Sequence, residues 1–233
     1  MGVAYLLPFL AVASDLLAGW FALGQRAERI ERRYVVAFAA GVLLSVTFFD
    51  VLPEAEVAAN ASFLALGFVT FYVLEKTMMI HACGESECET HEIGPVAVLG
   101  MALDNVLDGA GIVSGYLIDP FLGLAITVAV VLHEIPQRMT AALIMREAKW
   151  SRAGIWVGLG LTGLIYPVGG FLAGLIAPEF RHTVLAFIAG DFLYLAAGDL
   201  LPDAHRRFNW KVILSVLLGM AFMLALTRLV PAV

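Results

Sequence analysis

The stretch AFAAGVLLSVTFFDVLPEA, residues 37–55, is an apolar run that ends in an acid, a proline and a second acid. A second stretch, AFIAGDFLYLAAGDLLPDA at residues 186–204, aligns with it without a gap and is identical at nine of nineteen positions, including the pair Asp50/Asp199. Segments rich in Ala and Leu resemble one another by composition alone, but composition does not explain a shared D-x-L-P-acid-A ending. The chain therefore contains an internal repeat.

The composition indicates a protein whose surroundings are lipid. Of its 233 residues, 61% are hydrophobic and only 15% are charged, and the mean hydropathy is +0.89. An ordinary soluble domain has about 25% charged residues. A net charge of −6 offers no basic surface for nucleic acid. We therefore predict an all-α integral membrane protein that forms a single transmembrane domain over residues 1–233.

Apolar runs of spanning length, about 20 residues each, predict eight transmembrane helices. The first lacks a preceding basic segment and is long enough to span, so we expect a helix rather than a removable signal peptide. The repeated stretches fall in the second and seventh helices, which cross the membrane in opposite directions. This predicts an inverted repeat of helices 1–3 and 6–8 around helices 4 and 5. The predicted ranges are 2–23, 34–53, 62–80, 94–117, 120–146, 153–177, 182–202 and 210–230.

The basic residues predict the orientation. An even number of crossings places both termini on one side, and the loops on the other side hold 11 of the 14 basic residues. By the positive-inside rule, those loops are cytoplasmic and both termini face outward. They contain Arg26, Arg29, Arg32, Arg33, Lys76, Arg146, Lys149, Arg152, Arg206, Arg207 and Lys211.

Helices 4 and 5 carry polar side chains in otherwise apolar runs, ALDNVLDGAGIV at 102–113 and VVLHEIPQRM at 130–139. Two pairs are spaced four residues apart, which places each pair on one helix face, and a further polar residue follows the first member of each pair. Carboxylate, amide and imidazole groups together suit Zn²⁺, Mn²⁺ or Fe²⁺. The candidate metal ligands are Asp104, Asn105, Asp108, His133, Glu134 and Gln137.

Hydrogen bonding between helices is the alternative explanation of these polar residues. It accounts for the amides Asn105 and Gln137, because amides commonly join membrane helices. It does not account for three acids and a histidine, since one charge at the bilayer centre costs about 2.5–3.5 kcal/mol even on a lenient scale. We therefore interpret the cluster as functional.

These residues resemble the ZIP (Zrt/Irt-like) family of divalent metal transporters over nearly the whole chain. That family carries H-N-x-P-E-G in helix 4 and H-x-x-P-E-G in helix 5, where this chain has DNVLDG at 104–109 and HEIPQR at 133–138. The resemblance implies eight helices with both termini outside, in a bacterial inner membrane or a plasma membrane. It also implies transport of a divalent metal, Zn²⁺, Mn²⁺, Fe²⁺ or Cd²⁺, toward the cytoplasm, with the metal as substrate and no cofactor.

The departures from the family pattern bear on the metal. Asp104 and Asp108 make helix 4 an oxygen-only stripe, which shifts the expected preference toward Mn²⁺ or Fe²⁺ without excluding Zn²⁺. Gln137 and Tyr166 replace residues that in some relatives complete a second metal position. We hypothesise that Arg138 stands in for that second metal; the alternative is that its long side chain extends toward the cytoplasmic end of helix 5.

Three aspartates are candidates for the transport path: Asp191 in the middle of helix 7, and Asp50 and Asp199 at the ends of the repeats. Each could instead pair with a neighbour or cap a helix end. The segment 81–93 is predicted to be a cytoplasmic loop rich in His, Cys and Glu. Capture of metal by this loop and a merely solvated acidic loop both remain open. Its candidate ligands are His81, Cys83, Cys88 and His91.

Two other classes of function fit the sequence less well. An intramembrane metal-dependent hydrolase would explain a metal with a general base, but residue 137 is Gln, so the H-E-x-x-H motif is broken. A receptor or scaffold would need neither inward-facing acids nor an inverted repeat. We expect no enzymatic activity. The expected partners are divalent metal ions and the lipid bilayer, and a homodimer is kept as an option.

Overall fold

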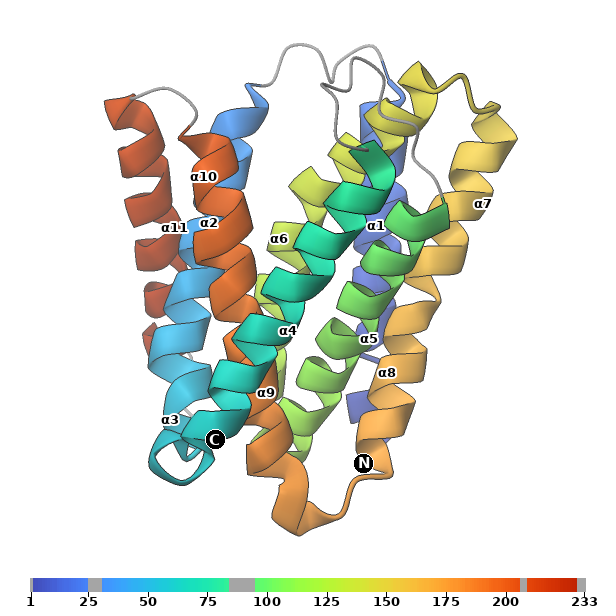
Figure 1. Ribbon diagram of the computed structural model, residues 1–233. Coiled ribbons are helices and arrows are strands. Elements are labelled where there is room, and N and C mark those ends of the chain that lie inside the picture. Colours follow the sequence, from blue (N-terminus) through green and yellow to red (C-terminus); the bar gives the residue numbers. More distant parts are fainter. Residues whose placement is uncertain (1, 25–30, 84–94, 206–208, 230–233) are drawn as a thin grey trace.

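The computed structural model describes residues 2–24, 31–83, 95–205 and 209–229. Within these ranges all regular structure is helical, and the helices form eight rods side by side in one bundle (Figure 1). The start of η1 and the end of α11 lie at the same, lower end of the bundle in Figure 1, as an even number of rods requires.

The first four rods lie in the N-terminal half of the chain. They are η1–α1 (Gly2–Tyr5 and Pro8–Ala22), α2–η3–α3 (Arg32–Val46, Thr47–Val51 and Leu52–Glu54), α4 (Val57–Cys83) and α5 (Pro95–Ile118). The other four are α6 (Pro120–Glu147), α7–α8 (Arg152–Gly163 and Ile165–Gly174), η4–α9–η5–α10 (Pro178–Phe180, Arg181–Tyr194, Leu195–Leu200 and Leu201–Ala204) and α11 (Trp210–Leu229). The eight helices predicted from the sequence are therefore present.

Seven of the rods are long and apolar enough to cross a membrane, and they begin at residues 2, 32, 57, 120, 152, 178 and 210. The eighth rod, α5, does not meet that criterion over the residues that the structure describes. It carries Asp104, Asn105 and Asp108, which lower its hydropathy. The protein is an integral membrane protein with multiple helical spans.

The connection between α5 and α6 holds these two helices side by side and antiparallel. Only Asp119 separates them, and its side chain accepts a hydrogen bond from the backbone N–H of Leu122 at 2.9 Å. This caps α6, and Pro120 at its first position has no N–H that would need a partner. The tight turn brings the polar stretches of both helices to neighbouring positions.

Two rods contain a π-helical turn, and the two turns lie at equivalent positions of the similar stretches 37–55 and 186–204. The turns are η3 at Thr47–Val51 and η5 at Leu195–Leu200, and each is followed by a proline, Pro53 or Pro202. Proline cannot donate the hydrogen bond to the carbonyl four residues earlier, so the turn before it is free to widen. Asp50 and Asp199 lie within these turns.

Apart from the α5–α6 turn, where Gly123 meets the backbone of Tyr116, three helix pairs approach so closely that their backbones touch at glycine. Gly41 of α2 and Gly219 of α11 lie against each other's helices, as do Gly67 of α4 and Gly190 of α9. The third pair is Gly109 of α5 and Gly169 of α8, where a Cβ on Gly109 would overlap the carbonyl oxygen of Tyr166. Small residues permit this close packing of membrane helices.

We predict that Gly109→Ala strongly lowers the thermal stability of the detergent-purified protein, because the new methyl group must push α8 away from α5. Gly160→Ala is the matched control, since a Cβ there has no atom within 4 Å. That control should keep or slightly raise the midpoint of thermal unfolding, because alanine favours a helix over glycine by about 1 kcal/mol. Equal midpoints for the two variants would contradict the close crossing.

Candidate metal site

Four potential metal ligands meet between α5 and α6. Asp104 and Asp108 come from α5, and His133 and Glu134 come from α6. One ligand atom from each lies within 4.8 Å of the ligand atoms of the other three. Asp108, His133 and Glu134 are completely buried, whereas Asp104 is partly exposed. The residues singled out in the sequence thus include a set that the fold brings together.

The orientation of His133 suits it to bind a cation. Its Nδ1 lies 3.0 Å from the carbonyl oxygen of Ala129, so this nitrogen carries the proton and donates it to the backbone. The Nε2 lone pair then faces the carboxylates, 3.5 Å from Asp108 Oδ2 and 3.8 Å from Glu134 Oε1. A histidine ligand in a metal site is normally held by such a bond from its other nitrogen.

The cluster is rich in acceptors that lack donors. Both carboxylate oxygens of Asp108, Oε1 of Glu134 and Nε2 of His133 have no hydrogen-bond partner among the described residues. Buried acceptors without donors are costly, and three carboxylates this close repel one another. A cation bound between them would remove both penalties.

A second polar group surrounds Arg138, which is only 1% exposed. Its Nε lies 2.6 Å from Glu134 Oε2 and 3.0 Å from Asp15 Oδ2. Its Nη2 donates to Asn105 Oδ1 and, at 3.2 Å, to the hydroxyl of Tyr166, which in turn donates to Asp15 Oδ1 at 3.3 Å. Arg138 therefore points into the bundle and does not extend to its end.

Glu134 links the metal cluster to the Arg138 group, because one carboxylate oxygen faces His133 and the other faces Arg138. Asn105 belongs to the Arg138 group: its oxygen accepts from Arg138 and its nitrogen donates to the carbonyl oxygen of Thr162 at 2.8 Å. Asp15 of α1, an isolated acid in the first apolar run of the sequence, completes the Arg138 group. A buried acid and a buried base in two apolar helices are expected to pair, but this expectation does not say which of the acids meets Arg138.

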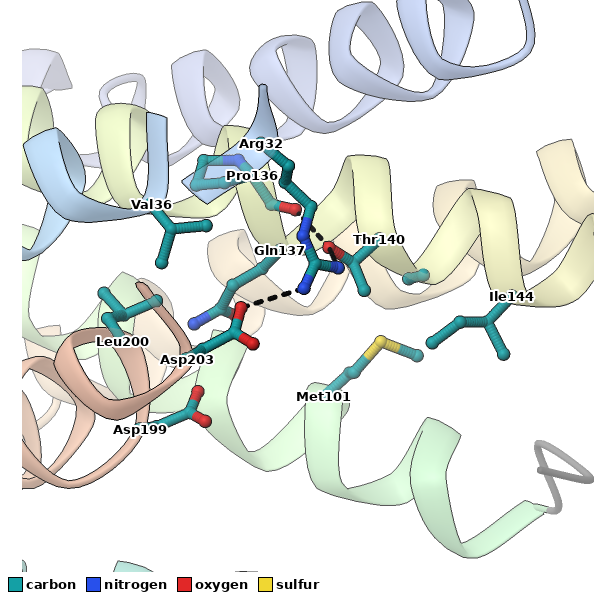
Figure 2. A pocket seen from close by; sticks show the side chains of 11 residues that line it. Arg32, Val36, Met101, Pro136, Gln137, Thr140, Ile144, Asp199, Leu200 and Asp203 are labelled. Atoms are coloured by element: carbon teal, nitrogen blue, oxygen red, sulfur yellow. Dashed lines mark hydrogen bonds and ion pairs between the residues drawn. The ribbon is translucent and has the colours of Figure 1, made fainter. Parts of the chain in front are cut away.

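Gln137 lines a cavity of about 380 Å³ that lies one helical turn from His133. Asp199, Asp203 and Thr140 also line it (Figure 2). Arg32 reaches across the cavity, where Nη1 donates to Thr140 Oγ1 at 2.8 Å and Nη2 contacts Asp203 Oδ2 at 2.9 Å. Of the predicted residues, Gln137 and Asp199 therefore share this cavity.

The remaining candidates lie elsewhere. Asp191 of α9 is completely buried without a hydrogen-bond partner among the described residues, and it precedes Phe192, whose ring centroid lies 6.3 Å from that of His133. Asp50 lies partly exposed in η3. In the predicted loop 81–93, the backbone of His81 and Cys83 lies in the last turn of α4, and Cys88 and His91 are outside the described residues.

Comparison with known proteins agrees with this geometry. A family model described as "ZIP Zinc transporter" matches residues 81–227. "Zinc transporter ZIP13" of Pongo abelii is 28% identical over 211 residues, which cover 80% of this chain and 63% of that protein. "Zinc transporter ZIP13" of Mus musculus is 25% identical over 241 residues, which cover 80% of this chain and 66% of that protein. "Zinc transporter ZIP13" of Homo sapiens is 30% identical over 138 residues, which cover 54% of this chain and 37% of that protein.

The chain spans less than two thirds of the length of each of these relatives. The family model nevertheless covers more than half of this chain and includes both helices of the metal cluster. The family consists of transporters, which confirms the prediction that the chain is not an enzyme. From its buried Asp, His and Glu cluster and the extent of this match, the chain belongs to the ZIP zinc transporter family.

Proposed function

We propose that the chain imports divalent transition metal ions of the Zn, Mn or Fe class, moving them across the membrane toward the cytoplasm. The observation that carries this proposal is the buried cluster of Asp104, Asp108, His133 and Glu134, whose ligand atoms lie within 4.8 Å of one another inside a membrane bundle. Buried acids without donors inside a membrane protein mark an ion pathway by default.

The first-choice ligands are Asp104, Asp108 and His133, joined by Glu134. Three carboxylates and one imidazole bind Mn²⁺ and Fe²⁺ well and also accept Zn²⁺ or Cd²⁺. The printed names of the relatives favour Zn²⁺ as the first ion to test. Asn105 and Gln137 are assigned to supporting roles, because the amide of Asn105 is bonded to Arg138 and Thr162 and Gln137 lines the cavity.

The cavity beside Gln137 is proposed as the cytoplasmic part of the path. It adjoins the cluster along α6, and Asp199 on its wall would attract a cation that leaves His133. Asp191, on the α9 side of the cluster, is proposed as a further acid along the path, since it is completely buried and its neighbour Phe192 packs against His133. Asp50 is assigned to the opposite end of the bundle from the cavity, near the outer face.

An inverted repeat is part of the proposal and has support beyond the aligned sequences. Gly41 and Gly190 occupy equivalent positions in the two copies, and each contacts the backbone of a helix in the other half of the pattern, α11 or α4. The π turns η3 and η5 also fall at equivalent positions. In such a repeat, α1, α2 and α4 correspond to α7–α8, α9 and α11, and α5 corresponds to α6. The pair α2–α11 then corresponds to the pair α9–α4, and the pair α5–α8 corresponds to the pair α6–α1.

Those four pairs and α5–α6 are the most extensively packed in the bundle. They divide it into one group with α1, α5, α6, α7 and α8 and another with α2, α4, α9 and α11. We propose that alternating access is a movement of the first group, which holds the metal cluster, against the second. α5 is then the eighth crossing. The contact of Arg32 with Thr140 joins the two groups across the cavity.

Orientation is tested with the native cysteines, Cys83 and Cys88. The described basic residues Arg32, Arg146 and Lys211 lie near the start of α2, the end of α6 and the start of α11, and these helix ends share one end of the bundle (Figure 1). The positive-inside rule assigns that end to the cytoplasm. We expect an impermeant maleimide to leave both cysteines unlabelled on intact cells and to label them after permeabilisation. In a chain with both cysteines replaced by serine, Glu179→Cys in η4 at the opposite end should be labelled on intact cells. Labelling of the native cysteines on intact cells would show that the orientation is the reverse of the proposed one, and transport would then have to be interpreted as export.

The position of the site is tested by uptake of Zn²⁺, Mn²⁺, Fe²⁺, Co²⁺ and Cd²⁺ into liposomes that contain the purified protein. Asp108→Ala should abolish uptake, because it removes the buried carboxylate that lies 3.5 Å from His133 Nε2. Joint replacement of His81, Cys83, Cys88 and His91 should leave substantial uptake and alter only regulation or apparent affinity. If the loop variant were inactive and Asp108→Ala active, the transport site would have been assigned to the wrong residues.

The cavity is tested with a cysteine introduced into the serine background. Thr140→Cys, which lines the cavity, should react with a water-soluble thiol reagent applied from the cytoplasmic side and should be protected from the outer side. Thr127→Cys, on the same helix but 3% exposed, is the control and should stay unreactive from both sides. Equal reactivity of the two cysteines would rule out the cavity as an aqueous path.

A further inference from the structure

The guanidinium of Arg138 is contacted by side-chain oxygen atoms from several helices. Four side chains on four helices supply them: Asp15 on α1, Asn105 on α5, Glu134 on α6 and Tyr166 on α8. Asp15, Asn105 and Glu134 are completely buried, as is Tyr166. A single positive group therefore holds together oxygens that would otherwise repel one another.

Arg138 contacts its carboxylates as an ion, without the paired hydrogen bonds that a planar guanidinium usually makes. Arginine usually grips a carboxylate through two parallel N–H bonds of its planar fork. Here Nε lies between two carboxylates, 2.6 Å from Glu134 Oε2 and 3.0 Å from Asp15 Oδ2. Neither oxygen has a hydrogen-bond partner among the described residues, and neither does Nε itself. The attraction is thus ionic and poorly directed.

The same oxygens would suit a divalent ion. Two carboxylates, an amide oxygen and a phenol oxygen form an oxygen-only set of the kind that Mn²⁺ and Mg²⁺ prefer. Glu134 already spans the two places, with Oε1 directed to the metal cluster and Oε2 to Arg138. One carboxylate could in this way bridge two neighbouring cations.

We propose that Arg138 is a built-in cation that fills a second divalent-ion position, and that Asp15 supplies the carboxylate which balances it. The inference rests on the proposed function, because the two positions share Glu134. The guanidinium is bonded to the chain and cannot be transported, so this protein carries one metal ion in its membrane site. Removal of the guanidinium should open the second position to a free ion.

The test counts Mn²⁺ ions bound to the full-length chain after free ions are removed. Arg138→Gln should bind one more Mn²⁺ than the wild type, whereas Arg138→Lys, which keeps the charge, should bind the same number as the wild type. Asp15→Asn combined with Arg138→Gln should lose the added ion. The loop 81–93 is the same in all these chains, so any ions on it cancel in the differences. The added Mn²⁺ should also broaden the electron paramagnetic resonance spectrum of its neighbour, because Glu134 joins them.

Arg138→Gln leaves two acids without their cation, so this variant is expected to be unstable in a chelator and to regain thermal stability with Mn²⁺. Three results would overturn the proposal: no added ion in Arg138→Gln, an added ion that persists with Asp15→Asn, or a variant that fails to fold even with Mn²⁺. Asp108→Ala separates this inference from the proposed function, since it should remove the ion that the wild type binds. If the wild type binds no Mn²⁺ ion that Asp108→Ala removes, the proposed transport site is wrong. If the wild type binds that ion but Arg138→Gln binds no additional one, only the proposed role of Arg138 is wrong.

Discussion

The balance of charge around Glu134 is the constraint on which the centre of this bundle depends. Asp15, Asp104, Asp108 and Glu134 are acids in an apolar interior, and Arg138 is the base placed among them. Removing one partner of a buried ion pair typically costs about 3–5 kcal/mol, because the other charge is left uncompensated. The helices that carry these residues must therefore lie at matching depths, and the ion pairs set their register where apolar side chains alone would permit sliding.

α6 serves two purposes with two adjacent stripes of residues. Glu134 and Arg138 face the inside of their own group of helices, where Asp15 and Tyr166 meet them. His133 faces Asp108, and Gln137, one turn further on, lines the cavity. A covalently attached positive group and the proposed site for an exchangeable one thus lie on adjacent stripes of one helix. This arrangement limits how much charge the exchangeable site must accommodate.

Much of this architecture could be predicted from the sequence, because hydropathy and helical periodicity act locally. The eight helices and the stripe of Asp104, Asp108 and His133 follow from spacing along single segments. The partners of Arg138 could not be predicted in this way. Asp15 is 123 positions away in the chain, and its contact depends on how α1 and α6 are rotated against each other. The same is true of Asn105. Its position next to Asp104 predicts roughly which helix face it lies on, but not that its side chain is hydrogen-bonded to Arg138.

The two repeats illustrate a further limit. Their aligned residues reveal that two helices share an ending, but the widened turns η3 and η5 are visible only in the backbone. Proline marks where a hydrogen bond is lost, and the surrounding helices decide whether the chain kinks, breaks or widens. In this protein the turn widens in both copies, which keeps the rods continuous across the membrane.

The glycine crossings decide which surfaces can slide. Gly41, Gly67 and Gly109 each contact the backbone of a helix in their own group, and a backbone has no rotamers with which to yield. Between the groups, the described glycine contact is different: Gly111 of α5 meets the side chain of Ile188 on α9. Methyl groups can change rotamer as one surface passes another. The proposed motion would then follow the seam lined by side chains, and each backbone-locked group should travel as a unit with its buried charges undisturbed.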